Sequence, residues 1–220
     1  MQAFISYSHQ DRARGADIKK VLDHFGIPAF LAHDDIEVSR EWRDEILRRL
    51  LECDICIALL SEAFRSSDWA PQEIGIVASR PEVLVVPLSI DSTVSFGFIS
   101  HLQSKPLPTH ATPIGLVMRP IVQRFQEELI PRIIANVRDS PGWRYSESFM
   151  GLLEPFFESL TDDQLQELVD GAISNFEVWA AADCIKKYLP GLLTRVGDRI
   201  DPQRVEVLKY QIEHQEPFNG

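Results

Sequence analysis

The sequence predicts an α/β domain, with a parallel sheet wrapped by helices, followed by a small all-α domain. Three observations support this prediction. Short apolar runs in the first part are nearly continuous rather than alternating, which is typical of strands covered on both faces. Amphipathic helical patterns separate these runs, and strands that alternate with helices form parallel sheets. Residues 139–220 contain almost no strand-like run and have helical periodicity instead.

Four strands are expected from the apolar runs of the first part. They are Ala3–Tyr7, Ile27–Ala32, Asp54–Leu60 and Val83–Ile90. Helices are expected between and after them, because apolar residues recur there at helical spacing. The expected helices are Ala16–Phe25, Glu41–Leu51 and Ser67–Ser79, with a last helical region within Met118–Val137. Ligands of such sheets bind at the carboxyl ends of the strands, so functional residues are sought there.

A domain boundary is expected at the turn Asp139-Ser140-Pro141-Gly142, giving domains at residues 1–138 and 139–220. The net charge also differs between the two domains. The first has 15 basic and 18 acidic residues (−3), and the second has 7 basic and 15 acidic residues (−8), for a total of −11. The second domain is expected to be a helical bundle that governs assembly or regulation, with Pro190-Gly191 as one of its breaks. Its expected helices are Phe149–Leu160, a helix that starts at Thr161, Val178–Leu189 and Pro202–His214.

Composition excludes several classes of function. The acidic balance argues against nucleic-acid and anionic-membrane binding, which need clustered basic side chains. No apolar run approaches a membrane span, and no secretory signal is visible at the N-terminus. Three cysteines and six scattered histidines make neither a disulfide framework nor a metal site. A soluble, cytoplasmic protein is therefore expected.

Three polar segments follow strands and are expected to meet at one edge of the sheet. They are FISYSHQD (residues 4–11), HDDIEVSREW (33–42) and SDWAPQEI (67–74). Trp69 and Glu73 are four residues apart, so an indole and a carboxylate share one face of the expected helix. Position alone favours an ordinary solvated helix carboxylate for Glu73. Asp11 is expected to cap the helix that follows it.

These segments resemble the TIR (Toll/interleukin-1 receptor) domain family. FISYSHQD is similar to the first box of that family, and DWAPQEI to the segment that carries the catalytic glutamate in its NAD-hydrolysing branch. The resemblance covers roughly residues 1–137 and implies a flavodoxin-like sheet with a fifth strand within Leu102–Thr109. HDDIEVSREW and the later GFISHLQ are similar to bacterial TIR proteins, including those of antiphage defence systems such as Thoeris.

The resemblance implies an NAD+ nucleosidase that cleaves the bond between nicotinamide and ribose. Glu73 would be the catalytic residue and would stabilise the positive charge that grows on the ribose. Substrate contacts are implied for Ser8, His9, Asp34, Trp42 and Trp69. NAD+ is then the substrate, and no cofactor or metal is required. Attack by water would give ADP-ribose, attack by the adenine would give a cyclic ADP-ribose isomer, and the sequence does not choose between them.

Two other functions stay open at this point. A non-catalytic TIR adaptor would act through homotypic association, and a nucleoside deoxyribosyltransferase-like enzyme would share the sheet and a catalytic glutamate. The resemblance also implies self-association through TIR domains, with a protein partner for the helical domain. Many family members have a glycine in the loop after the second strand, where this chain has Ile36-Glu37-Val38-Ser39-Arg40, which suggests a different assembly geometry.

Overall fold

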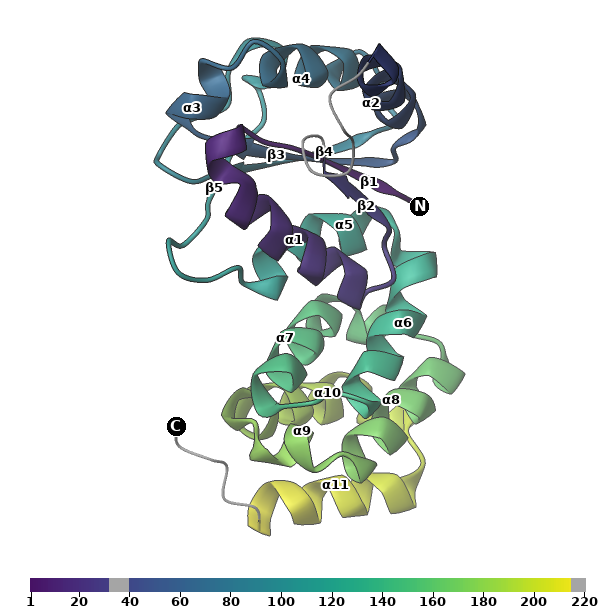
Figure 1. Ribbon diagram of the computed structural model, residues 1–220. Coiled ribbons are helices and arrows are strands. Elements are labelled where there is room, and N and C mark those ends of the chain that lie inside the picture. Colours follow the sequence, from purple (N-terminus) through teal and green to yellow (C-terminus); the bar gives the residue numbers. More distant parts are fainter. Residues whose placement is uncertain (32–39, 215–220) are drawn as a thin grey trace. The chain divides into compact units, whose positions relative to one another are not determined.

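The computed structural model describes residues 1–31 and 40–214, and the chain divides into two compact units, Met1–Arg124 and Phe125–Gly220 (Figure 1). The boundary expected from the sequence lies further along the chain, after residue 138. The segment between the two positions is helix α6 (Gln126–Arg138), which packs against helices of the second unit.

The first unit is built on a five-stranded sheet in which every pair of neighbouring strands is parallel. Its order, β2-β1-β3-β4-β5, is the flavodoxin-like order. The strands are β1 (Ala3–Ser6), β2 (Ala29–Leu31), β3 (Ile55–Leu60), β4 (Leu84–Ser89) and β5 (Lys105–Pro106). The predicted fold class is confirmed, and the fifth strand lies within the expected range.

Helices cover both faces of the sheet, with α2, α3 and α4 on one face and α1 and α5 on the other (Figure 1). Their bounds are α1 (Arg12–His24), α2 (Arg40–Glu52), α3 (Glu62–Arg65), α4 (Ala70–Ala78) and α5 (Ile114–Arg124). Every residue of β1 and β3 is therefore buried, as their continuous apolar runs predicted.

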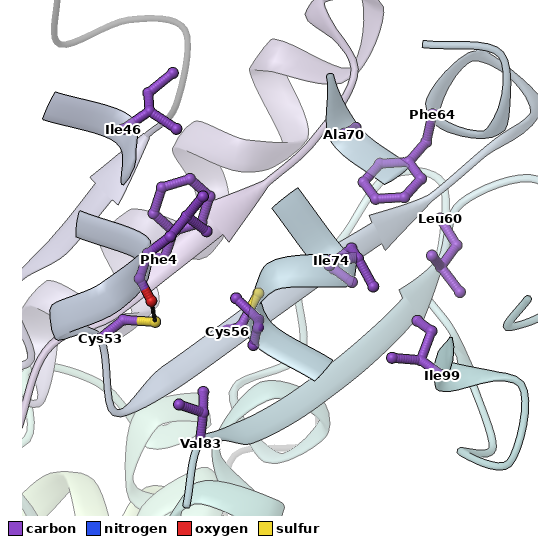
Figure 2. Packing of buried hydrophobic residues seen from close by; sticks show 13 residues of the cluster. Phe4, Ile46, Cys53, Cys56, Leu60, Phe64, Ala70, Ile74, Val83 and Ile99 are labelled. Carbon is purple, nitrogen blue, oxygen red and sulfur yellow. Dashed lines mark hydrogen bonds between the residues drawn. The ribbon is translucent and has the colours of Figure 1, made fainter. Parts of the chain in front are cut away.

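An apolar cluster joins the sheet to α2 and α4 (Figure 2). Phe4 of β1 and Cys56 of β3 form part of its floor, Ile46 belongs to α2, and Ile74 comes from α4. Because side chains from two strands and two helices pack together here, the first turn of α4 is held over the end of β1. Packing of this kind fixes the direction of any polar side chain on that turn.

The second unit is helical throughout its regular elements. After α6 come α7 (Trp143–Leu153), α8 (Asp162–Ser174), α9 (Phe176–Ala180), α10 (Leu189–Val196) and α11 (Pro202–His214). The expected break at Pro190-Gly191 is wrong, because α10 runs through both residues and directly continues the π-helical segment Cys184–Tyr188. The N–H that Pro190 lacks falls at the junction of the two segments, where the spacing of the helical hydrogen bonds changes. None of the helices in the described ranges has the length and apolar character that a membrane crossing requires.

Candidate active site

Glu73 lies in the first turn of α4, and its side chain is buried, with 3% of its surface exposed. Helix α4 begins here because Ser67 Oγ accepts hydrogen bonds from the backbone N–H groups of Trp69 and Ala70. Pro71 is tolerated in this turn because N–H groups at a helix start have no helical partner. A carboxyl group in such a place is unusual, since glutamate is almost never fully buried unless it is paired.

The partner of Glu73 is a hydroxyl group on the sheet. Ser6 Oγ donates a hydrogen bond to Glu73 Oε2 across 2.5 Å, and both side chains are buried. The other carboxyl oxygen, Oε1, is also buried and has no hydrogen-bond partner within the part of the chain that the structure describes. Each buried polar atom without a partner is costly, which makes Oε1 a candidate for contact with a ligand.

Burial changes the ionisation of this group. Desolvation raises the pKa of Glu73 from 4.5 to about 7, and the hydrogen bond from Ser6 opposes this rise. Both protonation states of Glu73 are therefore populated near neutral pH. A carboxyl group with such a pKa can act in catalysis as an acid, as a base or as a stabilising charge.

A cavity of about 180 Å³ lies beside Glu73, between α2 and α4. Its lining residues are Arg43, Ile46, Leu47 and Leu50 from α2, and Trp69, Gln72, Glu73 and Ile76. Complete ligand sites usually span about 300–1,000 Å³, so this cavity suits one ring rather than a whole dinucleotide. Trp69 is 42% exposed and is thus available to a bound ring, while the exposed Arg43 supplies a positive charge.

The structure brings together only part of the predicted site. Trp69 and Glu73 line the same cavity. Ser8 is buried just after β1 and His9 is exposed in a 3-10 turn, and neither is among the described residues that line the cavity. Trp42 belongs to α2, but its side chain, like the whole of Asp34, lies outside the described residues.

The sequence model of the TIR domain family matches residues 3–111, a range that contains all five strands as well as Ser6, Trp69 and Glu73. Residues 3–111 form a TIR domain. No curated protein matches the chain. The TIR family includes enzymes that hydrolyse NAD+, and its members in general bind NAD+ and self-associate.

A second polar contact in the TIR domain joins Asp11, in the 3-10 turn that follows β1, to Ser61, the residue directly after β3. Ser61 Oγ donates to Asp11 Oδ2 across 2.6 Å. Asp11 makes no side-chain bond to the start of α1, so the expected helix cap is wrong, because the carboxylate is used by Ser61 instead. Burial raises the pKa of Asp11, the bond from Ser61 lowers it, and the charge of Asp91 raises it further.

Sequence reasoning missed Ser6, which is the hydrogen-bond partner of Glu73. One local signal exists for it: Ser6 interrupts the otherwise apolar run Ala3–Tyr7, which was expected to be covered on both faces. A hydroxyl group in such a strand has to find a partner inside the protein. The sequence shows that a partner is needed, but it does not show which side chain provides it.

Proposed function

We propose that the TIR domain is an NAD+ nucleosidase that cleaves the bond between nicotinamide and ribose, with Glu73 as its catalytic residue. One observation carries the proposal: a buried carboxyl group with one unpartnered oxygen among the described residues lies beside a ring-sized cavity. The pKa of about 7 adds support, because perturbed carboxyl groups cluster at functional sites.

Cleavage of the nicotinamide–ribose bond is favoured by a negative charge near the ribose. Nicotinamide leaves NAD+ from a cationic pyridinium, so it departs as a neutral molecule and the positive charge passes to the ribose. An ionised Glu73 stabilises this charge, as a carboxylate does in glycoside hydrolysis. The scheme needs no metal or cofactor, because the pyridinium is already a good leaving group. Water attack on the ribose completes hydrolysis to ADP-ribose, and attack by the adenine completes cyclisation.

The bound substrate itself favours the reactive state of Glu73. A positive charge within a few ångströms of a carboxyl group lowers its pKa, so binding of the pyridinium shifts Glu73 towards the ionised form. In this scheme the nicotinamide ring lies in the cavity against Trp69, and Arg43 attracts the diphosphate. Ser8, His9, Asp34 and Trp42 remain proposed contacts for the rest of the dinucleotide.

We place this activity in bacterial antiviral defence of the Thoeris type, in the cytoplasm, on the resemblance of HDDIEVSREW and GFISHLQ to such proteins. TIR domains of the chain would assemble with one another before they reach full activity. Residues 139–220 carry eight of the eleven net negative charges and would contact a protein partner or transmit an upstream signal.

The test compares two substitutions of glutamate by glutamine in the full chain. Glu73→Gln removes the buried charge, and Glu62→Gln removes an exposed one at the start of α3 as the matched control. Purified proteins are incubated with NAD+ over a wide range of protein concentrations, and nicotinamide is measured by chromatography. We expect release by wild type and Glu62→Gln, and a loss of about 100-fold or more in Glu73→Gln.

Two results would overturn the proposal. If wild type releases no nicotinamide even as an oligomer, the domain is not an NAD+ nucleosidase and the adaptor function is favoured. If Glu73→Gln keeps the wild-type rate, Glu73 is not the catalytic residue. Deoxynucleosides are tested in parallel, since cleavage of these alone would identify a deoxyribosyltransferase.

A further inference from the structure

We propose that Ser6 is a positioning residue, which holds Oε2 of Glu73 so that Oε1 alone is presented to the ribose of the substrate. This role rests on the proposed function of Glu73. Ser6 itself touches no reacting atom in this scheme, and it acts only through the carboxyl group.

The donor is fixed by the sheet. Ser6 is the last residue of β1, it is fully buried, and its backbone pairs with Ala58 of the neighbouring strand β3. Phe4, two residues earlier in β1, lies in the cluster that also holds Ile74 of α4 (Figure 2). The hydroxyl group therefore starts from a rigid strand and meets a helix that is packed against the same sheet.

The geometry makes the two carboxyl oxygens different. A serine hydroxyl has one proton, and Ser6 gives it to Oε2 across 2.5 Å. Oε1 receives no hydrogen bond from any described residue. Without the bond from Ser6 the carboxyl group could turn about its last torsion and exchange the two oxygens, because that torsion is soft and nearly two-fold. A fixed carboxyl group enters the reaction without first losing this freedom.

Other charged groups near Glu73 leave this assignment unchanged. Arg43 of α2 lines the same cavity. Burial raises the pKa of the Cys56 thiol in β3, and the nearby Cys53 and Glu73 raise it further, so that Cys56 stays uncharged. Neither Arg43 nor Cys56 makes a hydrogen bond to Glu73 among the described residues. Replacing Ser6 therefore removes the one described donor and alters no charge around the carboxyl group.

The test uses Ser6→Ala and a matched control, Ser89→Ala. Ser89 ends strand β4, which β3 separates from β1, and it is buried like Ser6, but its hydroxyl has no partner among the described residues. The pH titration of the Glu73 carboxyl carbon is followed by ¹³C NMR in wild type and in both variants. We expect the pKa of Glu73 to rise in Ser6→Ala and to stay at its wild-type value in Ser89→Ala, because only the first loses a donor.

Kinetics provide the second measurement. In Ser6→Ala we expect kcat for nicotinamide release to fall about 10- to 100-fold, in line with the loss of a hydrogen bond to a charged group, with KM nearly unchanged. The pH midpoint of activity should move up with the titration. Ser6→Cys, which keeps a weak donor of similar shape, should recover part of kcat, and it replaces Ser6→Ala in all measurements if the alanine variant does not fold.

The two proposals fail in different ways. If wild type is inactive while Ser6→Ala alone shifts the titration of Glu73, the contact stands and the nucleosidase proposal fails. If wild type is active but Ser6→Ala keeps its kcat, its pH profile and the titration of Glu73, the positioning role of Ser6 is overturned.

Discussion

Glu73→Gln keeps the shape of a buried side chain and removes its ionisation, so this substitution isolates the free energy of charging a carboxyl group inside the TIR domain. Burial raises the pKa of Glu73 from 4.5 to about 7. Between these two pH values the Glu73 carboxyl group has mostly lost its proton in the unfolded chain but mostly retains it in the folded chain. The stability of wild type therefore falls as the pH rises from about 4.5 to about 7, and changes no further above that.

The size of the effect follows from the pKa difference of about 2.5 pH units, which is about 7 minus 4.5. At about 1.4 kcal/mol per unit, the full loss comes to about 3 kcal/mol at pH 8. At pH 5 the loss is only about 1 kcal/mol, because this pH is only about half a unit above the ordinary pKa of glutamate, and the free energy gained by ionising the unfolded chain grows with the distance of the pH from that pKa. Glutamine does not ionise, so the advantage of Glu73→Gln over wild type should grow by about 2 kcal/mol between pH 5 and pH 8.

Urea denaturation at both pH values measures this difference, with tryptophan fluorescence as the signal. Glu62→Gln is the control, because it makes the same chemical change in an exposed side chain at the start of α3. Constant effects of the glutamine side chain cancel when the two pH values are compared. A difference between Glu73→Gln and wild type that stays the same at pH 5 and pH 8 would refute the reasoning.

Two further predictions concern the second unit. Helix α8 begins with a capping box, in which Thr161 Oγ1 accepts from Gln164 N and Gln164 Oε1 accepts from Thr161 N. Thr161→Ala removes the capping oxygen and should lower the free energy of unfolding by about 1 kcal/mol, measured by thermal or urea denaturation. Gly171→Ala places a Cβ 3.0 Å from Arg138 Cβ and 3.2 Å from its Cα, so α6 and α8 must move apart. We expect the free energy of unfolding to fall by about 1–3 kcal/mol in the same assay.

Each of these two has a control in the same unit. Thr161→Ser keeps the capping oxygen and should leave stability nearly unchanged, whereas equal losses for the serine and alanine variants would contradict the capping argument. Gly191→Ala adds a Cβ in helix α10 with no atom within 4 Å, and should be neutral or stabilising. Wild-type stability in Gly171→Ala would show that the close approach to Arg138 relaxes freely.

The sheet could be predicted because its strands are buried on both faces. The runs that became β1 and β3 consist almost entirely of apolar residues, a pattern that few other structures produce. Helix ends were harder to predict, because a proline indicates the end of a helix unless its position within that helix is known. Pro190 shows this: it is the second residue of α10, which directly follows a π-helical segment, although the sequence favoured a break there.

The candidate site could be predicted only where its residues are close in sequence. Trp69 and Glu73 are four apart on one helix, and both line the cavity. The partners of Ser6 and Asp11 could not be predicted, because Glu73 is 67 residues from Ser6 along the chain and Ser61 is 50 residues from Asp11. Contacts over such distances depend on strand order and helix packing, for which a single sequence has no local signal.

The separation of 67 residues between Ser6 and Glu73 also has a consequence for protein synthesis. At about 5–20 residues per second, a ribosome adds Glu73 roughly 3 to 13 seconds after Ser6. Until α4 has formed and docked, the carboxyl group stays in water, where a glutamate is fully ionised at neutral pH. The nascent chain therefore lacks the buried, half-protonated group, and Glu73 acquires its altered acidity only when this part of the domain has folded.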